Sequence, residues 1–308
     1  MPQVLISRSG PAPGTTPGTQ AAHAPESVFS IDVEDWFHIL QVPGVPALLT
    51  WDLLPSSVEK NFFRLLDLLS EHRVRSTCFF LGWVAERFPH LVRAASQRGH
   101  EVASHGFAHN LVFQMTARRF REDSLHARQI IEDIAGCPVR GYRAAGFSVI
   151  DRTPWFFDTL LEAGYEYDSS VFPASRGHGG IRTAMRTPHR VVCKSGTLIE
   201  FPITVADAYP RPTCFFGGGY LRLFPLWLIR HMARAVQAEG RPVIYYVHPR
   251  EIDPHHPRLK MPLHRKFKSY VNLGTTEHKI SRIVSEFPMV TFSEFIQRYG
   301  DTLEQSYV

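Results

Sequence analysis

The sequence predicts an α/β fold in which strands and helices alternate around a largely parallel sheet, either open or closed into a barrel. Two observations carry this prediction. Short apolar runs such as residues 77–81 and 242–247 are typical of strands buried on both faces, and stretches with helical periodicity lie between them. The 308 residues are 44% hydrophobic and 20% charged. This composition fits one large globular domain or two small ones and excludes collagen-like, coiled-coil and wholly disordered chains.

Residues 28–168 contain the signals for three strands, a fourth segment that is a strand or a loop, and four helices. The strands are expected at residues 28–33, 77–81 and 101–105, the strand or loop begins at 141–143, and the last helix leads to residues 165–168. The helices are expected at residues 58–69, behind a capping-box spacing from Ser56 to Glu59, and at 85–98, 116–136 and 155–163. Gly99 and Gly136 would end two of these helices, because glycine readily adopts the left-handed conformation found just past a helix.

The rest of the chain adds fewer signals. We expect an amphipathic helix over residues 221–239 that ends at Gly240, and a buried strand over 242–248. A final strand, an N-cap at Ser293 and a helix are expected at 288–295. Residues 1–26 contain five prolines and three glycines, a composition that predicts a disordered tail.

Charge and composition limit the classes of function. The chain has 34 Lys and Arg against 29 Asp and Glu, without a long basic run or a nucleic-acid-binding motif, so we expect no nucleic-acid partner. Four widely spaced cysteines favour reduced thiols over a disulfide framework. No apolar stretch is long enough to predict a transmembrane span. The N-terminus lacks the pattern of a signal peptide, so we expect a cytoplasmic location.

Polar residues stand at the ends of four predicted strands. Asp32, His105, Arg143 and His248 each follow the apolar part of such a strand. In parallel α/β folds, functional groups gather at the carboxyl ends of the strands. Each residue alone has an ordinary structural explanation, such as a helix cap or a hydrogen-bonded core histidine. Their occurrence at four strand ends favours one shared site.

Two clusters predict a metal ion at that site. Three carboxylates among residues 32–35 repel one another unless water or a cation compensates their charge. His105 and His109 are four residues apart, a spacing that lets two imidazoles on one turn share a metal. Two histidines with one carboxylate leave coordination positions for water and substrate, which is typical of catalytic zinc.

The order of these segments resembles the polysaccharide deacetylases of the NodB-homology type, carbohydrate esterase family 4. Residues 76–80 and 82–89 are similar to the family's ATFF…G…AE…P segment. Residues 99–109, GHEVASHGFAH, are similar to its GHE…SHGYSH motif. The resemblance implies a distorted (β/α) barrel in a single catalytic domain over residues 27–308.

Other segments resemble a subgroup linked to bacterial exopolysaccharide loci, including exosortase-associated ones. They are residues 32–37 (DVEDWF), 217–222, 248–254 and 270–274. The subgroup resemblance implies a specific C-terminal part from about 210 to 308.

The resemblance also implies individual roles. Asp32 aligns with the family's general base, Arg143 with the arginine that orients this base, and His248 with the general acid. His105 and His109 align with the metal-binding histidines. The residue that orients His248 is not identified by the resemblance.

The metal carboxylate is open between two residues, because the family has adjacent aspartates where this chain reads Asp-Val-Glu-Asp. If the strand continues, its period of two places Asp32 and Glu34 on the same face. If the strand breaks after Val33, Asp35 can turn inward. We slightly prefer Asp35, with Glu34 as the alternative, and Asp168 is a first guess for the partner of His248.

The implied activity is a metal-dependent hydrolase that removes N-acetyl groups from N-acetylhexosamine units of a bacterial oligo- or polysaccharide, in exopolysaccharide biosynthesis. The metal would be Zn²⁺, or another divalent ion such as Co²⁺ or Mn²⁺. Trp36, Phe147 and Tyr220 are candidates for stacking on sugar rings. A polymer substrate would place the enzyme near the inner-membrane side of a polysaccharide synthesis machinery.

Two other functions stay open at this stage. An allantoinase-like hydrolase of cyclic amides would use the same fold. A catalytically silent sugar-binding protein is the second alternative, and the presence of all five aligned polar residues argues against it. The sequence does not fix the oligomeric state.

Overall fold

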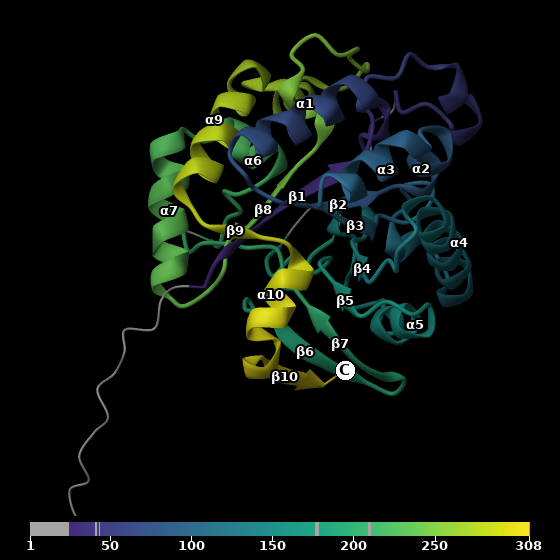
Figure 1. Ribbon diagram of the computed structural model, residues 1–308, viewed down its shortest axis with the longest axis vertical. Coiled ribbons are helices and arrows are strands. Elements are labelled where there is room, and N and C mark those ends of the chain that lie inside the picture. The colour runs from purple at the N-terminus through teal and green to yellow at the C-terminus, as the bar shows by residue number, and fades with distance from the viewer. Residues whose placement is uncertain (1–24, 41, 43, 176–178, 209–210, 308) are drawn as a thin grey trace, which may run out of the picture.

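The computed structural model describes residues 25–40, 42, 44–175, 179–208 and 211–307. The tail predicted at 1–26 lies almost wholly outside these described residues. Within them, the chain is a mixed α/β fold with one sheet (Figure 1). Every strand pairing in the sheet is parallel except that of β6 with β7. The predicted fold class is therefore confirmed.

The strands follow one another in the order β10-β6-β7-β5-β4-β3-β2-β1-β8, and β9 pairs with β1. Their bounds are β1 Ser27–Val33, β2 Thr77–Phe80, β3 Glu101–Ser104, β4 Gly141–Tyr142, β5 Tyr167–Asp168, β6 His189–Cys193, β7 Gly196–Glu200, β8 Ile244–Val247, β9 Met289–Val290 and β10 Glu304–Tyr307.

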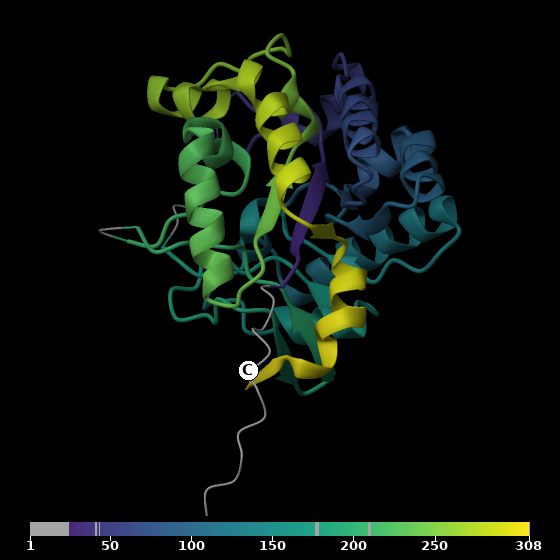
Figure 2. The same ribbon diagram turned by 60° about the vertical axis from the view of Figure 1, so that its left-hand side comes forward.

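Helices cover the outside of this sheet. The α-helices are α1 Val58–Glu71, α2 Gly82–Arg87, α3 Pro89–Gln97, α4 Ala117–Ala135, α5 Phe156–Glu162, α6 Gly218–Leu223, α7 Leu226–Ala238, α8 Leu263–Tyr270, α9 Leu273–Glu286 and α10 Phe292–Tyr299. The 3₁₀ helices are η1 Trp36–His38, η2 Leu48–Leu53, η3 Val112–Gln114, η4 Ala145–Phe147, η5 Pro249–Ile252 and η6 Gly300–Thr302. Helices α9, α1, α3, α4 and α5 each contact the next around the sheet (Figures 1 and 2). None of the described helices combines the length and the apolar character needed to cross a membrane.

Side-chain alternation along the strands separates two apolar cores. In β1, Phe29 and Ile31 belong to the core that includes residues of the surrounding helices. Val28 faces the other way, into an inner core with Phe79 of β2 and Tyr246 of β8. Because side chains alternate with a period of two, the end of β1 directs Asp32 to the same inner side as Val28.

The sheet curves toward closure, but strand pairing does not continue all the way round it. Within the described residues, β10 and β8 are the ends of the strand order. The gap beside β8 is closed by residues 201–205: the backbone N–H of Ile203 donates to the Val171 carbonyl at 2.8 Å, and that of Ile244 donates to Thr204 Oγ1 at 2.9 Å. At this closure the Thr204 side chain accepts a hydrogen bond that a backbone carbonyl would accept in a regular sheet. The barrel is distorted for this reason.

Two predicted helices are each divided in two. The helix expected over 85–98 is split into α2 and α3 at Pro89, and the helix expected over 221–239 is split into α6 and α7 at Pro225. Proline lacks a backbone N–H and disfavours the helical conformation of the residue before it. The other predicted stops are confirmed, since Gly99 and Gly136 both have positive φ angles, 78° and 67°.

Two predicted caps are wrong. Helix α1 begins without a capping box at Ser56: the N–H groups of Ser57 and Val58 donate to the Asp35 carboxylate, and that of Val58 also donates to Ser56 Oγ at 3.3 Å. Helix α10 begins two residues earlier than expected, with Thr291 rather than Ser293 as its N-cap and Glu294 closing a capping box. Both helices still start within two residues of the predicted positions.

Candidate metal and acid–base site

Three strand ends bring most of the predicted polar residues to one cavity of about 420 Å³. The polar groups lining it include Asp32, Glu34, His38, His105, His109 and His248. They come from the carboxyl ends of β1, β3 and β8 and from the loops that follow them. The convergence expected from the parallel sheet is therefore present.

Asp32 is held by a fully buried arginine. Arg143 Nη1 donates to Asp32 Oδ1 at 2.6 Å and to Ser30 Oγ at 2.8 Å. Its Nε and Nη2 donate to the carbonyl and hydroxyl oxygens of Ser169 at 3.2 and 3.1 Å. The guanidinium also stacks over the Phe79 ring, 4.1 Å from its centroid. These contacts leave Arg143 one orientation, so it fixes the position of the Asp32 carboxylate.

Glu34, His105 and His109 form a set of three metal-ligand groups. Each offers one ligand atom, and these atoms lie within 4.8 Å of one another. His109 Nε2 is 2.8 Å from Glu34 Oε2. His105 Nδ1 donates to the Arg143 carbonyl at 2.7 Å, so its Nε2 keeps the lone pair that a metal requires. The three residues therefore fit a divalent metal in number, and the hydrogen bond of His105 leaves its Nε2 ready to bind one.

Asp35 lies outside this set. Its carboxylate accepts hydrogen bonds from the backbone N–H groups of Trp36, Ser57 and Val58 and from the Ser56 hydroxyl, at 2.5–3.3 Å. Strand β1 does end at Val33, but the residue that turns toward the imidazoles is Glu34. The geometry thus favours Glu34 over Asp35, against the preference drawn from the sequence.

His248 stands between the carboxylates and a buried glutamate. Its Nε2 lies 3.7 Å from Asp32 Oδ2 and 3.5 Å from Glu34 Oε1. On the other side of the ring, Nδ1 lies 3.2 Å from Oε2 of Glu251, which also accepts from the His248 backbone N–H at 3.1 Å. Glu251 therefore orients His248. The guess of Asp168 is wrong, because its carboxylate bonds Ser170 instead.

Burial and charge set the protonation of the site. Burial lowers the pKa of His105 to about 4, which favours the neutral form that binds metals. Burial would also lower the pKa of His248, but the negative charges of Glu34 and Glu251 outweigh it and raise that pKa. Burial would raise the pKa of Glu34, but His109 and His248 lower it well below its usual value.

The sequence analysis missed four residues around this cavity. Glu251 and Arg250 follow His248 in η5, and Arg222 lies 3.4 Å from Glu251 through its Nε. His38 accepts a hydrogen bond at Nδ1 from the Asp35 N–H at 2.9 Å, so its Nε2 carries the proton in the neutral ring. A glutamate three residues after His248 was a readable capping signal, whereas nothing in the sequence pointed to the other three.

Of the three aromatic residues predicted to stack on sugar rings, two line the cavity and one does not. Phe147 and Tyr220 line the cavity. Trp36 does not belong to its lining; it is 6% exposed, packs against Phe37 and donates from Nε1 to the Pro55 carbonyl at 2.9 Å. The prediction for Trp36 is therefore not supported, and its role is to pack the core.

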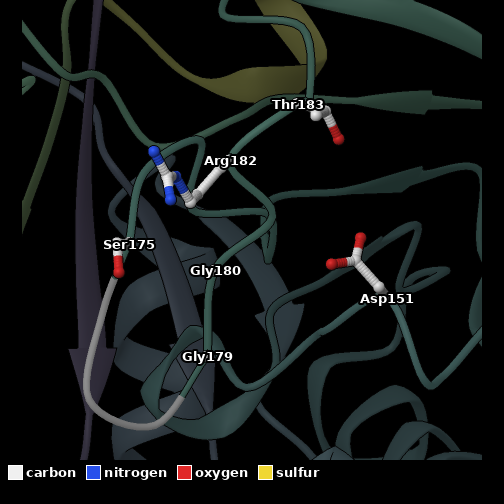
Figure 3. A pocket seen from close by; sticks show the side chains of 6 residues that line it. All are labelled: Asp151, Ser175, Gly179, Gly180, Arg182 and Thr183. Atoms are coloured by element: carbon white, nitrogen blue, oxygen red, sulfur yellow. The ribbon is translucent and has the colours of Figure 1, made fainter.

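A second cavity of about 550 Å³ shares Ser175 with the first. Its described lining is Asp151, Ser175, Gly179, Gly180, Arg182 and Thr183 (Figure 3). Figure 3 shows the Arg182 and Asp151 side chains on opposite sides of this space. None of the predicted site residues lines it, so the first cavity is the candidate active site.

Comparison with known families and proteins relates this chain to deacetylases. Residues 41–167 match the family model described as polysaccharide deacetylase, and residues 169–297 match a domain of unknown function, DUF3473. A peptidoglycan deacetylase of Helicobacter pylori is 31% identical over 124 residues, 38% of this chain and 41% of that protein. A chitooligosaccharide deacetylase of Sinorhizobium fredii is 35% identical over 101 residues, 32% of this chain and 45% of that protein. The matches span less than half the length of either relative.

Solved structures share the fold over nearly the whole chain. A Mycobacterium smegmatis protein named as a polysaccharide deacetylase has a TM-score of 0.63 at 19% identity, covering 96% of this chain and 98% of that one. The PuuE allantoinase has a TM-score of 0.59 at 16% identity, covering 94% and 95%. At these identities the likeness establishes the fold alone.

Proposed function

Because this chain belongs to the polysaccharide deacetylase family of the NodB type, we propose that it is a metal-dependent hydrolase of N-acetyl groups. Its substrate in this proposal is a glycan containing N-acetylhexosamine units, used in bacterial exopolysaccharide biosynthesis. The observation that carries the proposal is that Asp32, held by the buried Arg143, lines one cavity together with the Glu34–His105–His109 set and His248.

Glu34, His105 and His109 would hold the metal, for which we propose Zn²⁺. When bound, zinc lowers the pKa of water to about 7 and polarises a carbonyl oxygen as a Lewis acid. The two imidazoles and one carboxylate leave positions free for water and substrate, as in catalytic rather than structural zinc sites.

The chain's own residues supply the proton transfers. Asp32, fixed by Arg143, accepts a proton from the attacking water as its oxygen bonds to the amide carbon. His248, favoured as imidazolium, donates a proton to the sugar nitrogen as the carbon–nitrogen bond breaks. The products are acetate and a free amine. A positioned acid or base of this kind contributes about 10²–10⁴ to the rate.

The C-terminal half contributes one wall of the cavity. Gly218, Tyr220 and Arg265 line it, and all three lie in the region that matches DUF3473. We propose that residues 27–308 work as one catalytic domain, in which the part from about 210 onward shapes the substrate site.

An assay of acetate release with metal analysis tests the proposal. Purified protein should contain about one zinc ion per chain and release acetate from N-acetylated oligosaccharides such as chitopentaose. A chelator should abolish the release and added Zn²⁺ should restore it. Opening of a cyclic ureide such as allantoin without acetate release would assign the alternative amide hydrolase. Sugar binding without either reaction would assign a binding protein.

Glu251→Gln is expected to lower kcat through His248. His248→Gln should lower kcat by about 10²–10⁴-fold. Glu251→Gln should lower kcat by a smaller factor. Because Glu251 acts by orienting His248, the double variant should be no slower than His248→Gln alone. Glu277→Gln, which removes the partly exposed partner of Arg64, serves as the control. Additive losses in the double variant would show that Glu251 acts independently of His248.

A further inference from the structure

We propose that the substrate carries an anionic group, a carboxylate or a phosphate, beside the acetylated sugar, and that Arg250 binds it. This inference rests on the proposed function and specifies the class of glycan. Arg250 is in η5, directly after β8, and lines the candidate active-site cavity.

Two of the three nitrogens of the buried Arg250 guanidinium lack a hydrogen-bond partner among the described residues. The residue is 9% exposed, and within the described part of the chain its Nε and Nη1 have no hydrogen-bond partner. Its nearest carboxylate oxygen is Oε1 of Glu34, 3.7 Å from Nε, which is too far for a hydrogen bond. Buried donors in native proteins are almost always paired. A partner for Arg250 is therefore expected from outside the chain.

The other buried arginines of the site differ from Arg250. Arg143 donates to Asp32 and to Ser169 through all three of its nitrogens. Arg222 donates from both terminal nitrogens, to the carbonyls of Ser269 and Lys268 at 2.6 and 2.8 Å. Arg143 is held through all three nitrogens and Arg222 through its two terminal nitrogens, with only its Nε unpartnered, whereas Arg250, which lines the cavity, has two buried nitrogens without a partner among the described residues.

The charges around the cavity favour an anion. The carboxylates Asp32, Glu34 and Glu251 are balanced in number by the three buried guanidinium groups. A divalent metal on Glu34 and the two imidazoles would leave two positive charges in excess, before any proton on His248 is counted. Arg265 and Lys268 also line the cavity and add to this excess. A planar guanidinium with free N–H groups matches the paired oxygens of a carboxylate or phosphate, and a neutral glycan would leave it unpaired.

The alternative is that Arg250 serves only to hold Glu34 in place. In that case its replacement would weaken metal binding and slow all substrates equally. A role in substrate binding instead changes the preference between substrates. The ratio of kcat/KM values for anionic and neutral glycans separates the two.

The experiment compares three substrates and two variants. Acetate release is measured with chitotetraose, with a heparosan tetrasaccharide, which carries glucuronate, and with chitotetraose 1-phosphate. The wild type should prefer an anionic substrate by about 10- to 100-fold, the worth of a charge-assisted hydrogen bond. Arg250→Gln should remove the preference, and Arg250→Lys should keep part of it. Arg258→Gln is the control, because this exposed arginine lies over the Tyr270 ring. The preferred member of the anionic pair identifies the group.

Calorimetry on the metal-free protein gives a readout that does not depend on activity. The preferred anionic tetrasaccharide should bind the wild type about 10- to 100-fold more tightly than Arg250→Gln. Equal affinities, or a wild-type enzyme that prefers chitotetraose, would overturn the inference while leaving the proposed deacetylase intact. If the wild type releases no acetate from any substrate, the proposed function fails, and the calorimetric comparison still decides whether Arg250 binds the anion.

Discussion

Asp32→Asn is expected to lower acetate release by about 10²–10⁴-fold while the bound zinc remains. The amide cannot accept the proton of the attacking water. The side chain keeps its shape and an oxygen that can accept from Arg143 Nη1, which lies 2.6 Å from Oδ1 in the wild type. Asp32 is not one of the three grouped ligand residues, so metal binding should be unaffected. The measurement is kcat for acetate release together with zinc content per folded chain.

The control for this variant is Asp67→Asn, which removes an exposed carboxylate paired with Arg98. Both variants lose one negative charge, but only Asp32→Asn should lose turnover. The buried pair with Arg143 is also broken, and breaking such a pair by removing one charge is destabilising. Circular dichroism at the assay temperature therefore has to show a folded protein. Wild-type turnover in folded Asp32→Asn would remove Asp32 from the role of base, and loss of zinc would make it a ligand.

The residues that the sequence predicted for the site and that the structure brings together share one property. Asp32, His105 and His248 stand at the ends of short apolar strands, and a parallel sheet brings such ends together. The period of two along β1 then predicts the side of the sheet that Asp32 faces. Local patterns of this kind are independent of distant parts of the chain, which explains why they could be read directly.

The choice between Glu34 and Asp35 could not be read in this way. It depends on Ser56, Ser57 and Val58, which lie more than twenty residues away and engage the Asp35 carboxylate at the start of α1. A long-range cap thus decides which acid is free to face the imidazoles. The breaks at Pro89 and Pro225, in contrast, had a local signal, because proline interrupts a continuous helix. The prediction overlooked it because the apolar residues on both sides of each proline keep a helical spacing.

The site is assembled from three stretches of the sequence. Asp32 and Glu34 precede the region that matches the deacetylase model at 41–167, which contains His105, His109 and Arg143. The His248 network lies in the region that matches DUF3473. Arg143 also crosses this boundary, because it donates to Ser169. Neither matched region by itself contains all the residues of the proposed site, which is the physical reason to propose that the two act as one functional unit.

Glu34→Gln and Asp35→Asn are two carboxylate-to-amide changes at adjacent positions. We expect the first to lose zinc affinity and the second to lose stability. Glu34→Gln removes the one carboxylate among the three grouped ligand residues. Its zinc affinity should fall by more than the 10–100-fold typical of changes outside the ligand set. Asp35→Asn should keep its zinc but lose about 1–3 kcal/mol of stability. The reason is that the new amide donors face the N–H and hydroxyl groups of Ser57 that Asp35 now accepts from.

Zinc content by mass spectrometry and unfolding in urea separate the two effects in the same preparations. Because the substitutions are chemically alike and adjacent, each variant is the matched control for the other. Loss of zinc from folded Asp35→Asn, with full occupancy in Glu34→Gln, would return the metal to Asp35. That result would require the start of α1 to release its cap, since the Asp35 oxygens that accept from Ser57 and Val58 would then have to face the imidazoles. The free energy of unfolding of Asp35→Asn therefore tests directly why Glu34 is the carboxylate available to a metal.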